Sequence, residues 1–290
     1  MKDRSYLNFQ LHHPAEALRP FIKHYWTISR PVAAVSRTTE YLPGDGGSCL
    51  ILNFSDAVCL NQQPFTDAAL YRGPTTQTTA FMPGKRIDMI GIHFYPGMAY
   101  PFVQQPMCEL FQEILPATDI WQASHWHSLH EQLAERPLIE QRLHCLNRWL
   151  LERLCAADQV HTAIKKSVNW LRQCAPAHTL DQLTAQVCLS QRQLERLFNH
   201  QVGMTPKRYC QVARVGRARQ VIKASSQKTS LSEQALIAGY YDQAHLTREF
   251  KKMVGLTPAA YRRQIDADRR AEKISLPADT ELASYDSPCI

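Results

Sequence analysis

The sequence predicts an α+β protein of two domains, with an N-terminal small β-sheet or barrel with helices and a C-terminal domain that is entirely helical. Three observations support this division. Short runs of β-branched and aromatic residues occupy 1–105, helical periodicity dominates from residue 106, and one helical motif occurs twice near the C-terminus. Since 290 residues suffice for two hydrophobic cores, we expect domains at 1–157 and 158–265, followed by a loose polar tail at 266–290.

The first 105 residues are expected to form strands, because their apolar runs are short and are separated by turn-forming residues. The clearest turn is P-G-D-G-G at 43–47, and Gly-Pro or Pro-Gly pairs punctuate the chain again near residues 73 and 84. The predicted strands lie at 23–30, 37–42, 48–54 and 86–95.

The segment 106–157 is predicted to be helical, and it carries a stripe of large apolar residues with heptad-like spacing. The stripe consists of Ile139, Leu143, Leu146, Leu150 and Leu154. Such a stripe is typical of packing within a domain, but it is also compatible with a homodimer seam. Both roles are open at this point.

A repeat in the C-terminal third identifies its architecture. The segment L-E-R-L-F-N-H-Q-V-G-M-T-P-K-R-Y begins at Leu194, and L-T-R-E-F-K-K-M-V-G-L-T-P-A-A-Y begins at Leu246. With an offset of 52, the two segments share Leu, Arg, Phe, Val, Gly, Thr, Pro and Tyr at eight of 16 positions. Chance agreement of this kind is improbable, so one supersecondary unit occurs twice.

Each copy carries its own signals for the start and end of a helix. Ser190 and Asp242 are good N-caps, while Gly203 and Gly255 stand where a helix ends in a left-handed residue. A shorter helix precedes each copy, at 179–189 and 230–241, and a helix at 207–224 connects them. A short helix, a tight turn and a capped second helix form a helix-turn-helix. The sequence therefore predicts a C-terminal all-α tandem helix-turn-helix domain.

The positive charge of the chain is concentrated in this domain. Residues 1–157 hold 13 Lys and Arg against 14 Asp and Glu, a net charge of −1, whereas residues 160–264 hold 17 against 5, a net charge of +12. Affinity for DNA comes largely from neutralising phosphates, so this focused charge favours a nucleic-acid partner. A composition of 44% hydrophobic and 20% charged residues excludes a disordered or fibrous protein.

Residues 160–264 resemble the DNA-binding domain of the AraC/XylS family of transcriptional regulators. The resemblance is carried above all by A-G-Y-Y-D-Q-A-H-L-T-R-E-F-K-K-M-V-G-L-T-P-A-A-Y-R-R, which begins at Ala238. It implies sequence-specific binding of double-stranded DNA by a transcription regulator, with RNA polymerase as a candidate partner. A recognition helix presents its N-terminal, outward side chains to base edges in the major groove.

In each unit, the outward positions of the second helix are the candidate base contacts, and the resemblance points to the same positions. They are Arg192, Glu195 and Arg196 in the first unit and Gln243, Thr247 and Arg248 in the second. The candidate phosphate contacts are Lys207, Arg208, Lys251 and Lys252. Arg196 and Arg248 occupy equivalent places in the two copies, so a salt bridge to the short helix is the alternative role for both.

The N-terminal half is expected to sense a small effector or to dimerise. Its segments F-I-K-H-Y-W, L-P-G-D-G-G and H-F-Y-P-G-M-A-Y look like segments of one subgroup of the family, which implies sensing or dimerisation and identifies no ligand. The alternative is a constitutive DNA-binding regulator whose N-terminal domain only dimerises or binds a partner. A pocket lined by mixed apolar and polar side chains favours sensing, and a filled core favours the alternative.

Enzymatic function, a metal site and a cofactor are not expected. The sequence shows no nucleophile elbow, phosphate-binding loop or dinucleotide fingerprint. His125, His127 and His130 lie close together but have no carboxylate or thiol companion. A Cys-dependent DNA-repair fusion is the enzymatic rival, and Cys49 and Cys108 show no activating cations nearby in sequence.

The chain is expected to act in the cytoplasm and away from membranes. The 9 cysteines are scattered and odd in number, which favours reduced thiols. No run of 18 apolar residues and no signal-peptide pattern is present.

Overall fold

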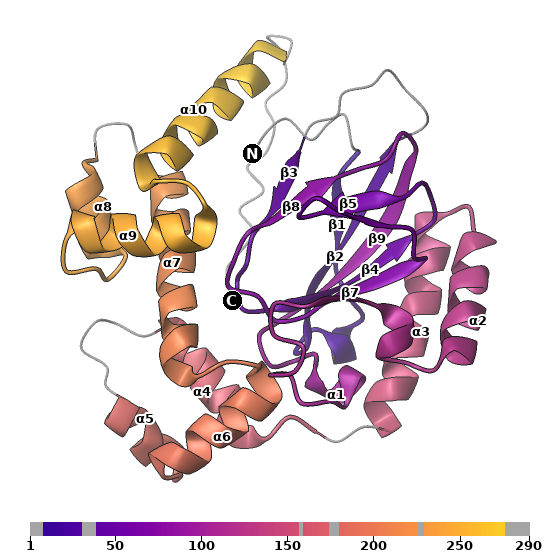
Figure 1. Cartoon of the computed structure of the whole chain (residues 1–290), viewed down its shortest axis with the longest axis horizontal. Coiled ribbons are helices and arrows are strands. Elements are labelled where there is room, and N and C mark those ends of the chain that lie inside the picture. The colour runs from indigo at the N-terminus through magenta and orange to yellow at the C-terminus, as the bar shows by residue number, and fades with distance from the viewer. Residues whose placement is uncertain (1–7, 31–38, 157–158, 174–179, 226–228, 276–290) are drawn as a thin grey trace.

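The computed structural model describes residues 8–30, 39–156, 159–173, 180–225 and 229–275. Two β-sheets with helices beside them form the N-terminal domain, and the C-terminal domain is helical (Figure 1). The predicted α+β class and the division into these two kinds of domain are therefore confirmed.

The N-terminal domain contains two open antiparallel sheets. The six-stranded sheet has the order β1 (Gln10–His12), β2 (Ile22–Arg30), β9 (Ile87–Phe94), β4 (Ser48–Asn53), β7 (Ala69–Arg72), β10 (Ile114–Pro116). The four-stranded sheet has the order β3 (Glu40–Leu42), β8 (Thr79–Met82), β5 (Val58–Leu60), β6 (Gln63–Phe65). Of the two predicted alternatives the sheet is confirmed, because these strands form no closed barrel.

The predicted strands correspond to β2, β3, β4 and β9, whereas the short strands between them were not predicted. The expected strand at 37–42 is described only from residue 39, and β3 spans its last part. β10 lies inside the segment 106–157 that was expected to be helical. It has only three residues, and its strand conformation comes from pairing with β7. Helical periodicity in the sequence cannot show such a pairing.

Strand β4 is buried along its whole length because both faces of its sheet are covered. Cys49 and Ile51 point into the core between the two sheets, while Leu50 and Leu52 point to the opposite face. Successive side chains of a strand point to opposite faces of the sheet. When both faces are covered, every position is buried, and the sequence of the strand is a nearly continuous apolar run.

Helices α1 (Tyr100–Val103), α2 (Ala123–Ala134) and α3 (Ile139–Ala156) pack on that opposite face, together with short 3-10 helices at Glu16–Leu18 and Ala117–Asp119. Leu146 and Leu150 of α3 are completely buried, and the remaining stripe residues pack against the same core. The apolar stripe of α3 therefore packs within its own domain.

The C-terminal domain consists of α4 (Thr162–Gln173), α5 (Leu180–Val187), α6 (Gln191–Val202), α7 (Pro206–Ala224), α8 (Leu231–Ile237), α9 (Gln243–Val254) and α10 (Pro258–Ser275). The pairs α5–α6 and α8–α9 form the two predicted helix-turn-helix units, and α7 connects them. The loose tail was predicted to begin at residue 266, which is too early, because α10 continues through residue 275. Residues 276–290 lie outside the described residues.

The hydrophobic core of the N-terminal domain continues into the first helix-turn-helix unit. Phe94, Met98 and Met107 belong to the same buried cluster as Ile164 and Val202. The second unit has a separate core, built around Leu246 and Phe250. The first unit is therefore the part of the helical domain that is packed against the sheets.

Two glycine-to-alanine substitutions should have opposite effects on stability. A Cβ atom at Gly91 would lie 1.8 Å from the indole of Trp26, whereas a Cβ atom at Gly216 in α7 would meet nothing within 4 Å. We expect Gly91→Ala to lower the free energy of unfolding by about 1–3 kcal/mol, because the indole must move. Gly216→Ala should raise it by up to about 1 kcal/mol, because alanine favours helix. Urea unfolding measures both, and an unchanged midpoint for Gly91→Ala would contradict the assigned packing.

Candidate nucleic-acid interface

Helix α6 begins and ends as its sequence predicts. Ser190 and Gln193 form a reciprocal capping box, in which the Gln193 backbone N–H donates to Ser190 Oγ at 3.3 Å and the Ser190 N–H donates to Gln193 Oε1 at 3.0 Å. Gly203 ends the helix with a φ of 85°. Such a cap contributes about 1 kcal/mol. The buried Leu194 and Phe198 set the inward face, so the opposite face of α6 is available to a partner.

Helix α9 repeats this construction in the second unit. The His245 backbone N–H donates to Asp242 Oδ1 at 2.7 Å, and Gly255 ends the helix with a φ of 82°. Leu246 and Phe250 are completely buried beneath it. Both predicted N-caps and both predicted terminating glycines are confirmed.

The turns before the two helices differ in the residue that takes the left-handed conformation. Gly239 has a φ of 88°, as its sequence position suggests. In the first unit Cys188 takes this conformation, with a φ of 55°. Cysteine gives no turn signal in a sequence, so this position was not predicted.

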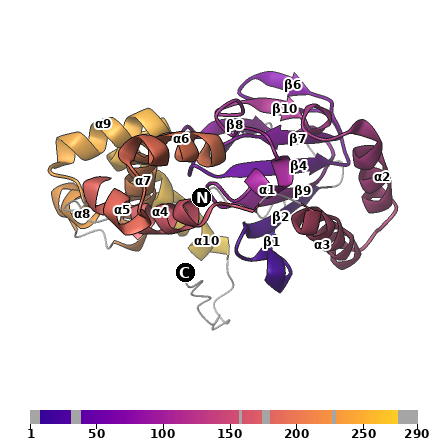
Figure 2. The same ribbon diagram turned by 90° about the horizontal axis from the view of Figure 1, so that it is seen from below.

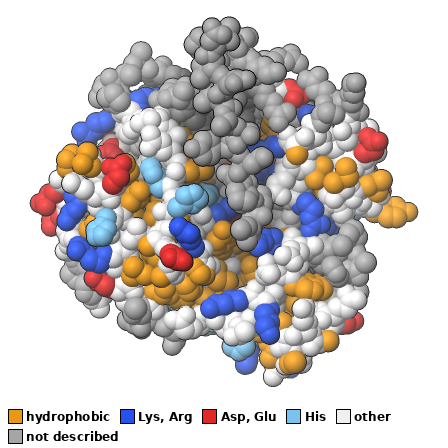
Figure 3. Space-filling model, turned by 180° about the vertical axis from the view of Figure 1, so that it is seen from behind, with side chains coloured by type: hydrophobic (Ala, Val, Ile, Leu, Met, Phe, Trp, Pro, Cys, Tyr) orange, Lys and Arg blue, Asp and Glu red, His pale blue; other side chains and the backbone are white. Residues whose placement is uncertain are grey.

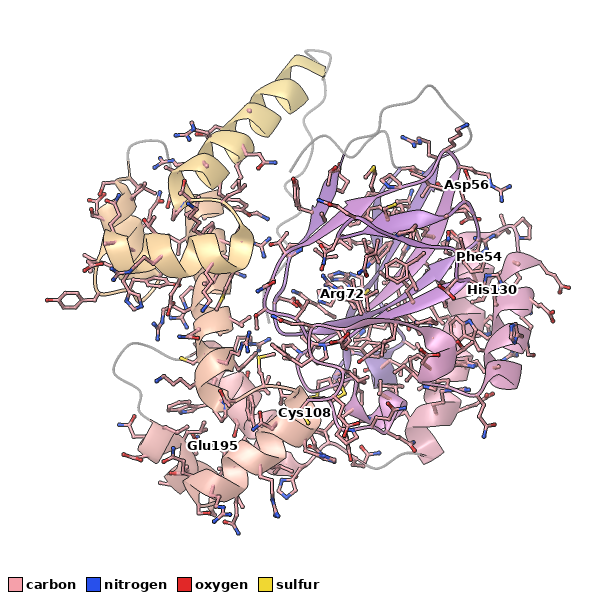
Figure 4. All side chains as sticks on the ribbon, in the orientation of Figure 1. Phe54, Asp56, Arg72, Cys108, His130 and Glu195 are labelled. Carbon is pink, nitrogen blue, oxygen red and sulfur yellow. The ribbon has the colours of Figure 1, made fainter. Side chains whose placement is uncertain are left out.

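The outward side chains of α6 are accessible. Arg192 and Arg196 are exposed, and Glu195 is half-buried on the same helix (Figure 4). Glu195 Oε1 accepts a hydrogen bond from Gln191 Nε2 at 2.9 Å. Within the described residues neither Arg196 nor Arg248 forms an ion pair, so the alternative salt bridge to the short helix is not observed.

The outward side chains of α9 are partly held in place by neighbours. Gln243 is exposed, and its Oε1 accepts a hydrogen bond from Ser232 Oγ of α8 at 3.1 Å. Thr247 Oγ1 donates to the Gln243 carbonyl at 2.8 Å. Arg248 is exposed. Of these three residues Arg248 is the one whose side chain forms no hydrogen bond with a described residue.

All four candidate phosphate contacts are exposed cations, and one of them, Arg208, also has a partner in the N-terminal domain. Lys207, Lys251 and Lys252 are exposed. The guanidinium of Arg208 lies 4.4 Å from the ring centroid of Phe111, and its Nη2 donates to Thr76 Oγ1 at 3.5 Å. Arg208 therefore contacts the N-terminal domain in this conformation.

The two recognition helices lie on the same side of α7 (Figure 2), which is the side facing the viewer in Figure 1. On the opposite face, Lys and Arg side chains are dispersed among polar and apolar ones wherever that face is described (Figure 3). The geometry thus presents α6 and α9 together toward one partner.

The N-terminal domain holds both recognition helices near their C-terminal ends. The Met107 backbone N–H donates to the His200 carbonyl at 2.8 Å, and the Tyr100 hydroxyl lies 3.1 Å from His200 Nε2. The Thr78 backbone N–H donates to the Met253 carbonyl of α9 at 3.1 Å. These contacts leave the N-terminal turns of α6 and α9 uncovered, which are the turns that read bases in a helix-turn-helix.

The residues considered for other chemistry have structural partners. His130 Nε2 lies 3.0 Å from the Asn53 carbonyl and its ring stacks on Phe54, whereas His127 is exposed (Figure 4). The side chain of His125 lies outside the described residues. Among described residues, no three His, Cys, Asp or Glu side chains lie close enough to share a metal ion.

Cys49 is unsuited to act as a nucleophile. Burial raises the pKa of its thiol to about 11, so at neutral pH it is not a thiolate. Cys108 is exposed. No described helix combines the length and the apolar character needed to cross a bilayer.

A cluster of titratable side chains lies at the edge of the N-terminal domain. His93 Nε2 is 3.2 Å from Asp45 Oδ1, and Lys23 Nζ is 3.3 Å from Asp45 Oδ2. Burial would raise the pKa of Asp45, but His93, Lys23 and the Gly47 N–H together hold it well below its ordinary value. Burial, together with His93 and Lys23, lowers the pKa of His24 to about 3.

Two family models match separate parts of the chain. Residues 183–264 match a helix-turn-helix domain, and residues 10–116 match a domain of unknown function (DUF6597). The first match contains both recognition helices. The second begins at the first residue of β1 and ends at the last residue of β10, so it covers both sheets.

The chain is similar over part of its length to three bacterial regulators. It is 33% identical over 86 residues to the HTH-type transcriptional regulator ArgR of Pseudomonas aeruginosa, covering 30% of this chain and 26% of that protein. GbdR of the same species is 32% identical over 103 residues, covering 36% and 28%. The transcriptional activator RhaS of Klebsiella pneumoniae is 31% identical over 87 residues, covering 30% and 31%. The matched segment thus spans between a quarter and a third of these curated relatives.

Two solved structures show how far the likeness in three dimensions extends. ToxT from Vibrio cholerae O395 has a TM-score of 0.47 at 8% identity, covering 89% of this chain and 98% of that chain. The DNA-binding domain of AdpA in complex with a target DNA has a TM-score of 0.35 at 25% identity, covering 38% and 98%.

The buried His24 should make stability depend on pH. The folded state holds His24 neutral, while the unfolded chain binds a proton below about pH 6.5. The contribution of neutral His24 to the free energy of unfolding is therefore fully present above this pH. It is lost as pH falls, by up to about 1.4 kcal/mol per pH unit between about pH 6 and pH 4. Denaturant unfolding at several pH values should give a shallower slope for His24→Gln, and the exposed His127→Gln is the control. Equal slopes for His24→Gln and the wild type would refute this assignment.

Proposed function

The helix-turn-helix domain of this chain belongs to the AraC/XylS family, and from this premise we propose that the protein is a sequence-specific DNA-binding transcription regulator. The observation that carries the proposal is the presentation of two capped recognition helices, α6 and α9, on one side of α7 (Figure 2). Exposed Arg196 and Arg248 stand at equivalent positions of the two helices. The surrounding segment, 160–264, carries a net charge of +12, from 17 Lys and Arg against 5 Asp and Glu. Such a charge supplies affinity for phosphate.

The two units are proposed to read different sequences in successive major grooves. Successive major grooves on one face of DNA are about 34 Å apart, one helical turn, and α6 and α9 are proposed to enter two such grooves. The first unit offers Arg192 and Glu195, and the second offers Ala244 and Thr247 at the corresponding positions. Arginine recognises guanine through O6 and N7, and threonine has no such preference. One monomer should therefore bind an asymmetric site with G·C pairs under the first unit.

The N-terminal domain is proposed to sense a small effector, and the whole protein to be non-enzymatic. A cavity between the two sheets, lined by apolar and polar side chains, supports sensing over a filled core. RNA polymerase and a second copy of the chain are proposed partners, and the cytoplasm is the proposed location because the DNA is there. The relatives ArgR and GbdR are transcriptional regulators and RhaS is a transcriptional activator, which supports this role.

Selection of binding sites from random duplexes tests the proposal. We expect the full-length protein to enrich an asymmetric two-part site, and its affinity to fall steeply with salt. The slope of log K against log salt should approach about −0.9 for each phosphate contact. Salt-dependent binding without enrichment would reduce the claim to non-specific attraction. Absence of binding at low salt would rule it out.

Single arginine variants should change one half of the selected site each. Arg192→Ala should relax the base preference under the first unit and cost about 1–3 kcal/mol on the selected site, with a smaller loss on random DNA. Arg248→Ala should do the same under the second unit. Lys166→Ala is the matched control, since it removes one exposed positive charge from α4. A uniform loss on all sequences would show that the two arginines contact only phosphates.

A further inference from the structure

A cavity of about 140 Å³ lies between the two sheets of the N-terminal domain. Its walls are mostly apolar and include Trp26, Ile28, Leu42, Ile51 and Phe81. An apolar cavity of about 150 Å³ accommodates benzene. The occupant that fits this space therefore has an apolar body of about that size.

One wall of the cavity carries a buried cation without a charged partner. Arg72 is only 4% exposed. Its guanidinium donates to Thr79 Oγ1 at 3.2 Å and to the carbonyls of Leu42 and Pro43, each at 3.4 Å. All three acceptors are neutral, and among the described residues no carboxylate is within ion-pair distance. The Nε of Arg72, which is labelled in Figure 4, is buried and has no hydrogen-bond partner among the described residues.

A buried guanidinium in this state favours a carboxylate ligand. Removing a charge from water is costly unless a counter-ion accompanies it, and a carboxylate can accept two parallel hydrogen bonds from Nε and a terminal nitrogen. Glu40 also lines the cavity but does not reach Arg72, and it has an interaction of its own. Arg72 therefore lines the cavity and retains one donor, its Nε, that has no partner.

Arg72 also stands at the base of two loops that touch the helical domain, one at α7 and the other at both α7 and α9. The loop 73–78 follows Arg72 and ends at Thr79. Thr78 bonds to the Met253 carbonyl of α9, and Thr76 accepts from Arg208 of α7. The loop 43–47 begins at the carbonyls that Arg72 holds, and a Cβ atom at Gly46 would be 3.3 Å from the ring of Tyr209.

A second side chain of the cavity holds the same loop. His93 lines the cavity and lies 3.2 Å from Asp45 Oδ1, within the loop 43–47. The cavity is thus connected to the helical domain through Arg72 and His93 together.

We propose that this cavity binds a small monocarboxylate with an apolar body, held by Arg72, and that binding alters the contacts that loops 43–47 and 73–78 make with α7 and α9. A ligand carboxylate competes with the carbonyls of Leu42 and Pro43 for the guanidinium, so the base of loop 43–47 is released when the ligand binds. Loop 73–78 is loosened with it, because the Gly46 N–H donates to the Thr75 carbonyl at 2.9 Å. The regulatory part of this proposal rests on the proposed DNA-binding function, while the binding part does not.

Titration of the full-length protein without DNA tests the binding part. The probes are hexanoate and benzoate, with hexanamide and benzamide as neutral analogues and hexylamine as a cation. We expect a carboxylate to bind at least about tenfold more tightly than its amide, because only the carboxylate brings a negative charge to pair with the Arg72 guanidinium. Equal affinity of acid and amide, preference for hexylamine, or no binding of either acid up to millimolar concentration would overturn the proposal.

Two variants separate loss of the ligand site from loss of folding. Arg72→Gln should abolish the preference for the acid over the amide. Leu42→Phe should weaken both ligands by reducing the cavity while leaving Arg72 in place, and its half-buried position in β3 tolerates the change better than a core site. Thermal unfolding of each variant confirms the fold. Retention of the acid preference in Arg72→Gln would assign the ligand to another group.

Hydrogen exchange without DNA tests the coupling. The backbone N–H groups of Thr78 and Met107 donate to the Met253 and His200 carbonyls across the domain boundary. A saturating carboxylate should accelerate exchange in the peptide containing Thr78, and the Arg72→Gln protein should show no such response. If the carboxylate binds but hydrogen exchange at Thr78 is unchanged, the proposed coupling is wrong and the proposed binding site still stands. If no DNA sequence is ever selected, the proposed function fails while these two measurements remain interpretable.

Discussion

The close approach between the end of α6 and the N-terminal domain is the contact on which the arrangement of the molecule depends. Gly203 ends α6 in the left-handed conformation, and a Cβ atom there would lie 2.6 Å from the Met107 carbonyl oxygen. The equivalent Gly255 in the second unit has nothing within 4 Å of its Cβ position. One glycine therefore satisfies both a helix cap and an interdomain contact, while its counterpart only ends a helix. Because of this contact, the first recognition helix shares a core with the sheets.

Most of the helical domain could be predicted because its signals are local. Ser190, Asp242, Gly203 and Gly255 act through hydrogen bonds and backbone conformations within one or two turns, and the repeat showed each signal twice. The N-terminal domain was less predictable. Its longer strands are marked by β-branched and aromatic residues between turn signals. In contrast, β10 has only three residues and owes its conformation to a partner 42 positions or more away, as in the pair of Ile114 and Arg72. Tertiary pairing of that kind leaves no periodicity in the strand itself.

The candidate interface divides in the same way between local and long-range information. The sequence identified which side chains of α6 and α9 face outward, because the apolar stripe of each helix determines its inward face. It could not show that Arg208, a basic residue next to a recognition helix, packs on Phe111 of the other domain. Charge identifies what a side chain can bind, and only the fold determines which partner is near. The buried Arg72 is the clearest case, since its sequence context, R-G-P, reads simply as a turn.

The two helix-turn-helix units differ in how they are attached, and this difference has a consequence for control. The first half of α7, with Tyr209 and Val212, belongs to the core shared with the sheets, whereas Val215 and Ala218 belong to the separate core of the second unit. The second unit touches the N-terminal domain through the Thr78–Met253 hydrogen bonds of 3.1 and 3.2 Å. Two recognition helices can occupy successive grooves only if their separation matches one turn of DNA, about 34 Å. A change at loop 73–78 therefore acts on the more weakly attached unit, whose position relative to α6 decides whether both grooves are reached together.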